Sequence, residues 1–144
     1  MGYKIWFDNH AKKHKQIVDK LLEQKYTKEQ IIDYFEFENI CREEIDFCPL
    51  YAKNEKCHDV EDLNCYLCAC PNFRFDDDGI RKIDQNTEYS SCSIKSKDGE
   101  EAIYGEQIHQ DCSKCLIPHS RNYIYKHFDL DWRYIMRNVG LKCD

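Results

Sequence analysis

The stretch from Cys57 to Cys70 constrains this chain more than any other part of it. It carries four cysteines and a histidine: Cys57, His58, Cys65, Cys68 and Cys70. A second C-x-x-C pair, Cys112 to Cys115, lies downstream, and His119 follows shortly after it. Two such pairs with nearby histidines are a metal-site pattern, because each turn places two sulfurs on the same side of the chain. The sequence therefore predicts a protein that binds metal.

The chain has ten cysteines among 144 residues, a high content for which a secreted disulfide scaffold is the alternative explanation. Disulfide-stapled domains are usually shorter than about 80 residues. The N-terminal sequence MGYKIWFDNHAKKHK also lacks the basic and then apolar segments of a signal peptide. No apolar run approaches the ~18 residues of a membrane span. We therefore expect a reduced, metal-loaded, cytoplasmic protein with no membrane contact.

The charge of the chain argues against nucleic acid as a partner. The formal net charge is −6, and metal-bound thiolates would make the cysteine sites more negative still. Non-specific nucleic-acid binding needs a basic face, and the basic clusters of this chain are small enough to be solvated helix faces. Ten tyrosines, in contrast, exceed what a small core needs, and tyrosine is favoured at wet protein interfaces. A protein partner is therefore expected, with packing of the tyrosines around the metal sites as the alternative.

Two helices are predicted in the N-terminal part of the chain. Residues 11–25 form an amphipathic pattern whose apolar stripe stands among lysines: Ile17, Val18, Leu21 and Leu22. Thr27 begins the second helix with a capping box, since its hydroxyl can accept from a helical amide while Gln30 reaches back. Residues 1–45 are therefore expected to form a helical hairpin that packs on the centre of the molecule.

Residues 46–144 are expected to form a cysteine-rich metal-binding domain with C-terminal helices, in one structural unit with the hairpin. Aliphatic periodicity weakens between Asp46 and His119, so metal binding would supply much of the folding free energy there. A hairpin is predicted at Asp98-Gly99 and a solvated turn over 76–79. The last helix, capped by Asp129 or Asp131, carries an apolar stripe: Trp132, Ile135, Met136 and Val139. The predicted class is α+β, a small metal-stabilised fold whose irregular knuckle and hairpin centre is flanked by helices.

The cysteine spacing suggests how ligands divide between sites. The simplest tetrahedral zinc set joins the two C-x-x-C turns: Cys65, Cys68, Cys112 and Cys115. The other candidates would form a second site: Cys48, Cys57, His58, Cys70, Cys92 and His119. Exchange of ligands between the two sites stays open. One or two zinc ions are predicted. Cys41 is expected to be a buried free thiol. The remaining histidines are expected to be ordinary polar residues: His10, His14, His109 and His127.

The order of these residues resembles one known family. The strings Cys57-His58, Asn64-Cys65-x-x-Cys68-x-Cys70-Pro71 and Asp111-Cys112-Ser113-x-Cys115-x-x-Pro118-His119 are similar to the bacterial and archaeal cysteine-rich small domain family over roughly residues 48–125. The resemblance implies a zinc-finger-like, metal-binding domain, which in some members is fused to cobalamin-biosynthesis enzymes. By position it implies these ligands: Cys48, Cys57, His58, Cys65, Cys68, Cys70, Cys92, Cys112, Cys115 and His119. The chain departs from the family pattern after Cys92, where Ser93-Ile94 replaces a common glycine pair.

Zinc is the favoured metal, since mixed cysteine and histidine shells are typical of it. A redox or metal-handling protein that holds iron or a 4Fe-4S cluster is the alternative, because the segment from Cys65 to Pro71 places three thiolates close together, although without ferredoxin spacing. Thiolate-rich shells are usually structural, so a structural, interaction or accessory module, linked by the resemblance to corrinoid metabolism, is favoured over an enzyme. A metal-dependent enzyme is the second alternative, with four acidic residues as candidate acids or bases: Asp59, Glu61, Asp62 and Asp111.

Overall fold

The computed structural model describes residues 2–58 and 60–140. Its helices are α1 (Tyr3–Glu23), α2 (Lys28–Tyr34), α3 (Phe37–Glu43), α4 (Arg121–His127) and α5 (Trp132–Ile135), with 3-10 turns η1 (Tyr51–Lys53) and η2 (Ile117–His119). Its strands are β1 (Phe73–Phe75), β2 (Arg81–Ile83), β3 (Asn86–Glu88), β4 (Ser90–Cys92), β5 (Glu100–Tyr104) and β6 (Gln107–Asp111). The predicted α+β class is confirmed.

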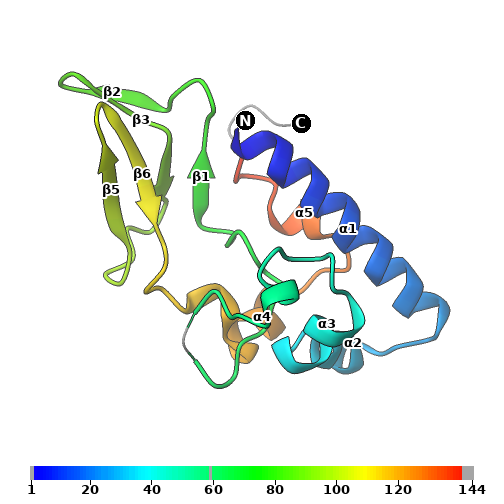
Figure 1. Cartoon of the computed structure of the whole chain (residues 1–144). Helices are drawn as coiled ribbons and strands as arrows, with labels where there is room; N and C mark the ends of the chain where they lie inside the picture. Colours follow the sequence, from blue (N-terminus) through cyan, green and yellow to red (C-terminus); the bar gives the residue numbers. More distant parts are fainter. Residues whose placement is uncertain (1, 59, 141–144) are drawn as a thin grey trace.

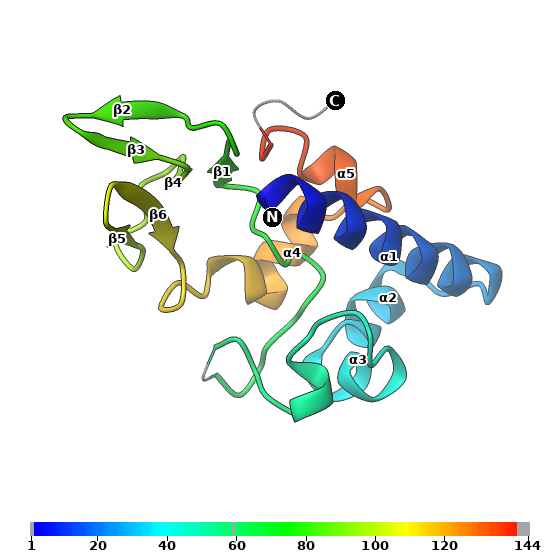
Figure 2. The ribbon, with the colours of Figure 1, turned by 45° about the horizontal axis from the view of Figure 1, so that its top comes forward.

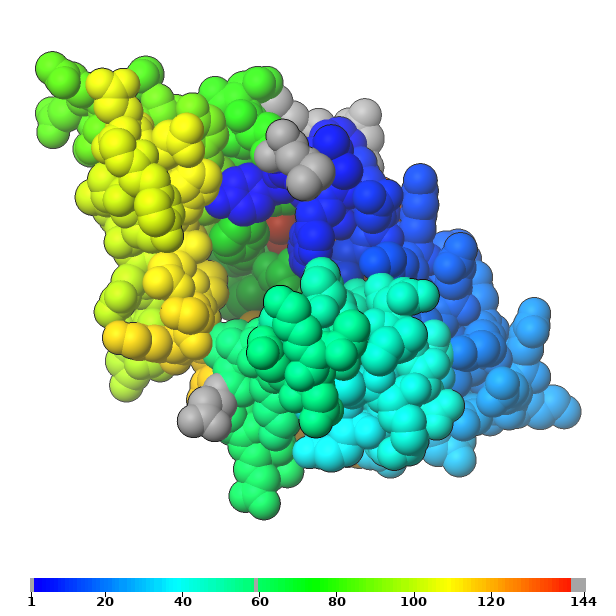
Figure 3. Space-filling view, in the orientation of Figure 1, coloured from blue at the N-terminus to red at the C-terminus, as the bar shows by residue number. Residues whose placement is uncertain are grey.

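The strands gather on one side of the molecule and the helices on the other (Figures 1 and 2). β1 pairs with β4 in a two-stranded sheet, and the larger sheet has the order β2-β3-β6-β5. The segment between η1 and β1 crosses from the helical side to the strands, and the segment from β6 to α4 crosses back (Figure 1). The space-filling view shows a hollow between the two sides on this face (Figure 3). Both cysteine-rich segments therefore lie where the helices and the strands meet.

α1 begins at Tyr3, well before the predicted start at residue 11. Its buried face includes Phe7 and Ala11, but also His10 and His14, which are 4% and 0% exposed. The expectation that these two histidines are ordinary polar residues is wrong. Both pack among aromatic rings such as Trp132, and burial lowers the pKa of His10 to about 4 and that of His14 to about 3. They are neutral at pH 7 and belong to the core.

The predicted capping box at Thr27 is confirmed, and both of its hydrogen bonds with Gln30 are present. The single helix expected after it is instead two helices, α2 and α3, separated by a break at Phe35-Glu36. The Phe35 carbonyl at this break accepts a hydrogen bond from the backbone amide of Cys65 at 2.8 Å. The first C-x-x-C turn is therefore anchored directly to the interruption between α2 and α3.

The hairpin predicted at Asp98-Gly99 is wrong. That dipeptide lies in a turn between β4 and β5, which belong to different sheets. The hairpin forms one strand later, where β5 and β6 pair antiparallel and the turn contains Gly105 at φ 63°. A left-handed backbone conformation favours glycine, and Gly105 provides it. The Asp-Gly signal identified a turn but joined the wrong pair of strands.

The acidic turn at residues 76–79 is confirmed, with the Gly79 amide donating to the Asp76 carbonyl at 2.9 Å. It is more than a solvated turn. The Asp77 carboxylate accepts hydrogen bonds from the amides of Tyr3 and Lys4 at 2.7 and 3.1 Å. Since these amides are at the start of α1, Asp77 satisfies donors that the helix itself leaves unpaired. This contact ties the strand side to the longest helix.

The C-terminal apolar stripe is confirmed as core-facing, with Trp132, Met136 and Val139 all buried. Of the two predicted caps, Asp129 and Asp131, the structure has Asp131, whose carboxylate accepts a hydrogen bond from the Arg133 amide. The helix itself, α5, is shorter than the stripe and ends at Ile135.

None of the helices within residues 2–58 and 60–140 combines the length and apolar character needed to cross a bilayer.

Candidate metal centres

The ten predicted ligands fall into two groups at the junction of the helices and the strands. The first, here called the quartet, consists of four cysteines: Cys70, Cys92, Cys112 and Cys115. The second, here called the six-donor group, consists of the other six predicted ligands: Cys48, Cys57, His58, Cys65, Cys68 and His119. The structure therefore assigns each C-x-x-C pair to a different group.

The quartet surrounds one small cavity of about 20 Å³. Pairing of β1 with β4 places Cys92 opposite Phe73, just after Cys70, and β6 ends at Asp111 immediately before Cys112. The strands thus bring together cysteines from distant parts of the sequence. A volume of that size is on the order of a single water molecule, too small for an organic substrate and suited to one ion.

Two polar groups of Ser96 face sulfurs of the quartet. The Ser96 amide donates to Cys92 Sγ at 3.5 Å, and the Ser96 hydroxyl lies 3.3 Å from Cys115 Sγ. Such donors stabilise a thiolate more than a thiol, and they are typical of metal–sulfur sites. In the absence of a cation, burial and the neighbouring thiols, first Cys70, raise the pKa of Cys112 to about 12. A divalent ion would reverse that balance and hold the thiolates.

The six-donor group is built around Cys65 and Cys68. A hydrogen bond from Cys68 lowers the pKa of Cys65, and the same bond, burial and the thiols of Cys57 and Cys48 raise the pKa of Cys68. The Tyr51 hydroxyl is buried beside Cys65 and has no hydrogen-bond partner among the described residues. A buried hydroxyl without a partner is costly, so the neighbouring Cys65 sulfur is the acceptor that suits Tyr51.

Within this group, Cys57, His58 and His119 form a compact arrangement, here called the triad. Each offers one ligand atom, and these atoms all lie within 4.8 Å of one another. His58 Nδ1 lies 3.0 Å and His119 Nε2 3.8 Å from Cys57 Sγ. The residues come from separate segments, since His119 ends η2 and the other two lie in the loop after η1. The fold therefore gathers one thiol and two imidazoles at one point.

The outer nitrogens of both imidazoles face backbone carbonyls. His119 Nδ1 lies 2.8 Å from the Asn64 carbonyl oxygen, and His58 Nε2 lies 2.9 Å from the Cys112 carbonyl oxygen. A carbonyl only accepts, so each of these nitrogens carries the proton and donates. The other nitrogen of each ring then presents a lone pair toward Cys57. Metal-binding histidines are held in this way, with the second nitrogen donating to a carbonyl or carboxylate.

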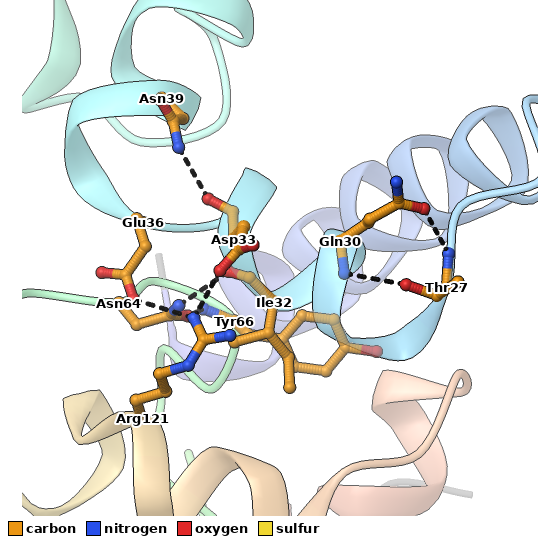
Figure 4. A network of polar contacts seen from close by, with 9 residues as sticks. All are labelled: Thr27, Gln30, Ile32, Asp33, Glu36, Asn39, Asn64, Tyr66 and Arg121. Atoms are coloured by element: carbon orange, nitrogen blue, oxygen red, sulfur yellow. Dashed lines mark hydrogen bonds and ion pairs between the residues drawn. The ribbon is translucent and has the colours of Figure 1, made fainter.

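Asn64 is fixed in turn by a polar network on the helical side (Figure 4). Its side chain is fully buried, donates to the Ile32 carbonyl at 2.8 Å and accepts from the Tyr66 amide at 2.9 Å. Arg121, at the start of α4, pairs with Asp33 at the end of α2 at 2.6 Å (Figure 4). These contacts hold α4, and with it the preceding η2 that carries His119, against α2. The orientation of the His119 ring therefore depends on residues outside the ligand set.

The simplest ligand set expected from spacing is not assembled. Cys65 and Cys68 lie with Cys48 and Cys57, whereas Cys112 lies with Cys70, Cys92 and Cys115. The reason is topological, since the strand that carries Cys92 and the end of β6 close on Cys70 and leave the first C-x-x-C turn with α2 and α3. The cysteines are thus grouped differently from the two sets that the spacing suggested, an exchange that the sequence left open.

The remaining candidates lie elsewhere. Cys41 is buried in α3, as predicted, and its thiol donates to the Tyr51 carbonyl at 3.7 Å. Cys143, the one cysteine not yet named, and the candidate base Asp59 lie outside the described residues. Glu61 and Asp62 are exposed, and the Asp111 carboxylate accepts from the Ser113 amide at 2.9 Å. Nothing in the described part of the chain places one of these three carboxylates among the triad.

Three residues that the sequence reasoning missed support the ligands: Tyr51, Asn64 and Ser96. Asn64 gave the only usable signal, because it directly precedes Cys65 in the string that carries the family resemblance. Tyr51 and Ser96 are ordinary residue types in ordinary sequence positions. Their roles depend on a thiol that the fold brings to them.

Comparison with known proteins does not extend this picture. The chain matches no protein-family model, no curated protein and no solved structure. The functional interpretation therefore depends on the residues of the two groups themselves.

Proposed function

We propose that this protein binds metal ions, zinc first, at two centres, one in the quartet and one in the six-donor group. The observation that carries the proposal is the triad, in which two imidazoles aim lone pairs at one thiol while their outer nitrogens donate to carbonyls. This arrangement is the one typical of metal-binding histidines. Zinc suits both a four-thiolate shell and a mixed cysteine and histidine shell.

The role that follows is a metal-stabilised structural, interaction or accessory module in a reducing, cytoplasmic environment. The two centres lie where the helices and the strands meet (Figure 1), so bound metal would add to the contacts that hold the strands to the helices. The resemblance to the cysteine-rich small domain family adds a link to corrinoid metabolism as part of the proposal. Free thiols at all nine described cysteines are consistent with a reducing compartment.

Iron is the second candidate at the quartet. Four thiols around a small cavity, with an amide and a hydroxyl directed at two of the sulfurs, suit a single iron as well as zinc. The volume of about 20 Å³ favours one ion over a cluster. Zinc and iron differ in colour and in redox activity, so this alternative is readily separated from the first.

Element-resolved metal analysis of protein purified without oxygen tests the proposal. We expect about two ions per chain, and about one after either Cys70→Ser or Cys57→Ser, which remove a ligand from different groups. Cys41→Ser is the matched control, since Cys41 is a buried thiol in α3 outside both groups, and its metal content should be unchanged. Metal-free protein that keeps its tertiary structure, or equal metal loss in all three variants, would contradict the proposal.

A further inference from the structure

We propose that the triad binds its metal ion through three protein ligands and leaves a fourth position open to solvent, where a small anion binds. This inference deepens the proposed metal binding and rests on it. It assigns different roles to the two centres. The quartet is a closed structural site, and the triad is a site that takes an external ligand.

The first argument is the number of donors. Among the described residues, Cys57 Sγ and one nitrogen each of His58 and His119 lie within 4.8 Å of one another, and no fourth cysteine, histidine or carboxylate joins them. Cys48, Cys65 and Cys68 lie in the same group but outside this set. Zinc with three protein ligands keeps a position for water or another ligand, whereas structural zinc takes four.

The second argument is exposure. His119 is only 5% exposed and forms the inner wall of the triad, while Cys57 is exposed and His58 is half-buried. The loop that carries Cys57 and His58 is closed by Lys56, whose Nζ donates to the carbonyls of Val60 and Glu61 at 2.9 and 3.2 Å. The metal would therefore be held from the inside and reached from the side of Cys57. In the quartet, by contrast, Cys115 is buried and the other three thiols are partly buried.

The third argument is charge, which selects the kind of ligand. A divalent ion with one thiolate and two neutral imidazoles carries a net charge of about +1, because the imidazoles add none. The same ion with four thiolates carries about −2. An anion is therefore attracted to the triad and repelled by the quartet. The external ligand is expected to be a small anionic donor, such as hydroxide, a carboxylate or a thiolate.

Cobalt substitution tests the inference, because the visible spectrum of Co²⁺ reports its ligands and their number. The full chain is loaded with Co²⁺ without oxygen and titrated with azide as the anionic probe. We expect azide to shift the visible bands of one of two bound ions and to saturate at one azide per chain. His58→Ala should remove one Co²⁺ and abolish the azide response, and Cys112→Ser should remove the other ion and leave the azide response in place.

Cys41→Ser is the matched control for removal of a buried thiol, since Cys41 lies in α3 outside both groups. Its cobalt content and azide response should equal those of the unchanged chain. Two bound Co²⁺ ions that ignore azide would overturn the open position while leaving metal binding intact. Loss of the triad ion in Cys48→Ser but not in His58→Ala would assign it to the thiols instead. A chain that takes up no Co²⁺ would overturn both proposals.

Discussion

Asn64→Ala should be among the most damaging substitutions outside the ligands. The Asn64 side chain is 0% exposed and makes two hydrogen bonds, to the Ile32 carbonyl at 2.8 Å and from the Tyr66 amide at 2.9 Å. Each buried group left without a partner costs about 1–3 kcal/mol, so the free energy of unfolding should fall by about 2–6 kcal/mol. Against a total of roughly 5–15 kcal/mol for a domain, this is a large loss.

The matched control is Asn39→Ala. The Asn39 amide also donates to a backbone carbonyl, that of Asp33 at 2.8 Å, but it does so at the surface, where water can replace it (Figure 4). Its cost should stay below about 1 kcal/mol. Urea unfolding of both metal-loaded variants measures the difference. If Asn64→Ala costs no more than Asn39→Ala, the reasoning from buried hydrogen bonds is refuted.

The same variant should also affect metal binding. Because the Asn64 carbonyl accepts from His119 Nδ1, a displaced residue 64 releases the ring. Loss of such an outer partner typically weakens metal binding about 10–100-fold. Competition with a chelator should therefore strip one ion from Asn64→Ala more readily, while the ion of the quartet keeps its affinity. Equal loss from both centres would point to global unfolding instead.

Three further predictions concern the core, the first helix and the metal. Between pH 6.5 and 4, His10 and His14 are protonated in the unfolded chain but stay neutral in the folded chain, where they are buried. Acid should therefore lower the free energy of unfolding. The slope for the unchanged chain should exceed that for His10→Phe by about 1.4 kcal/mol per pH unit, and equal slopes would contradict this. Asp77→Ala should cost about 1 kcal/mol in urea unfolding through the lost α1 cap, with Asp98→Ala, at a surface turn, as the neutral control. Chelation of the metal should abolish the cooperative thermal transition followed by near-ultraviolet circular dichroism, and an unchanged transition would count against metal-dependent folding.

Local sequence determined those features that depend on neighbours in the chain. The capping box at Thr27 and the turn at residues 76–79 arise from contacts within a few residues, and the spacing of the apolar stripe from Trp132 to Val139 is likewise a local property; all three are present. The sequence pattern did not predict the early start of α1, because histidine is normally counted as a polar residue. Only burial among aromatic rings makes His10 and His14 part of the apolar face.

Tertiary structure decided which donors meet. The sequence named all ten candidate ligands, since cysteine and histidine spacing is a local property, but their partition depends on strand pairing that spacing does not encode. β1 pairs with β4, and β5 with β6, so Cys92 and Cys112 come to Cys70, while the break between α2 and α3 retains Cys65. The lone pairs of His58 and His119 were likewise fixed by two carbonyls distant in sequence, because a ring with two nitrogens takes its tautomer from the acceptor that the fold provides.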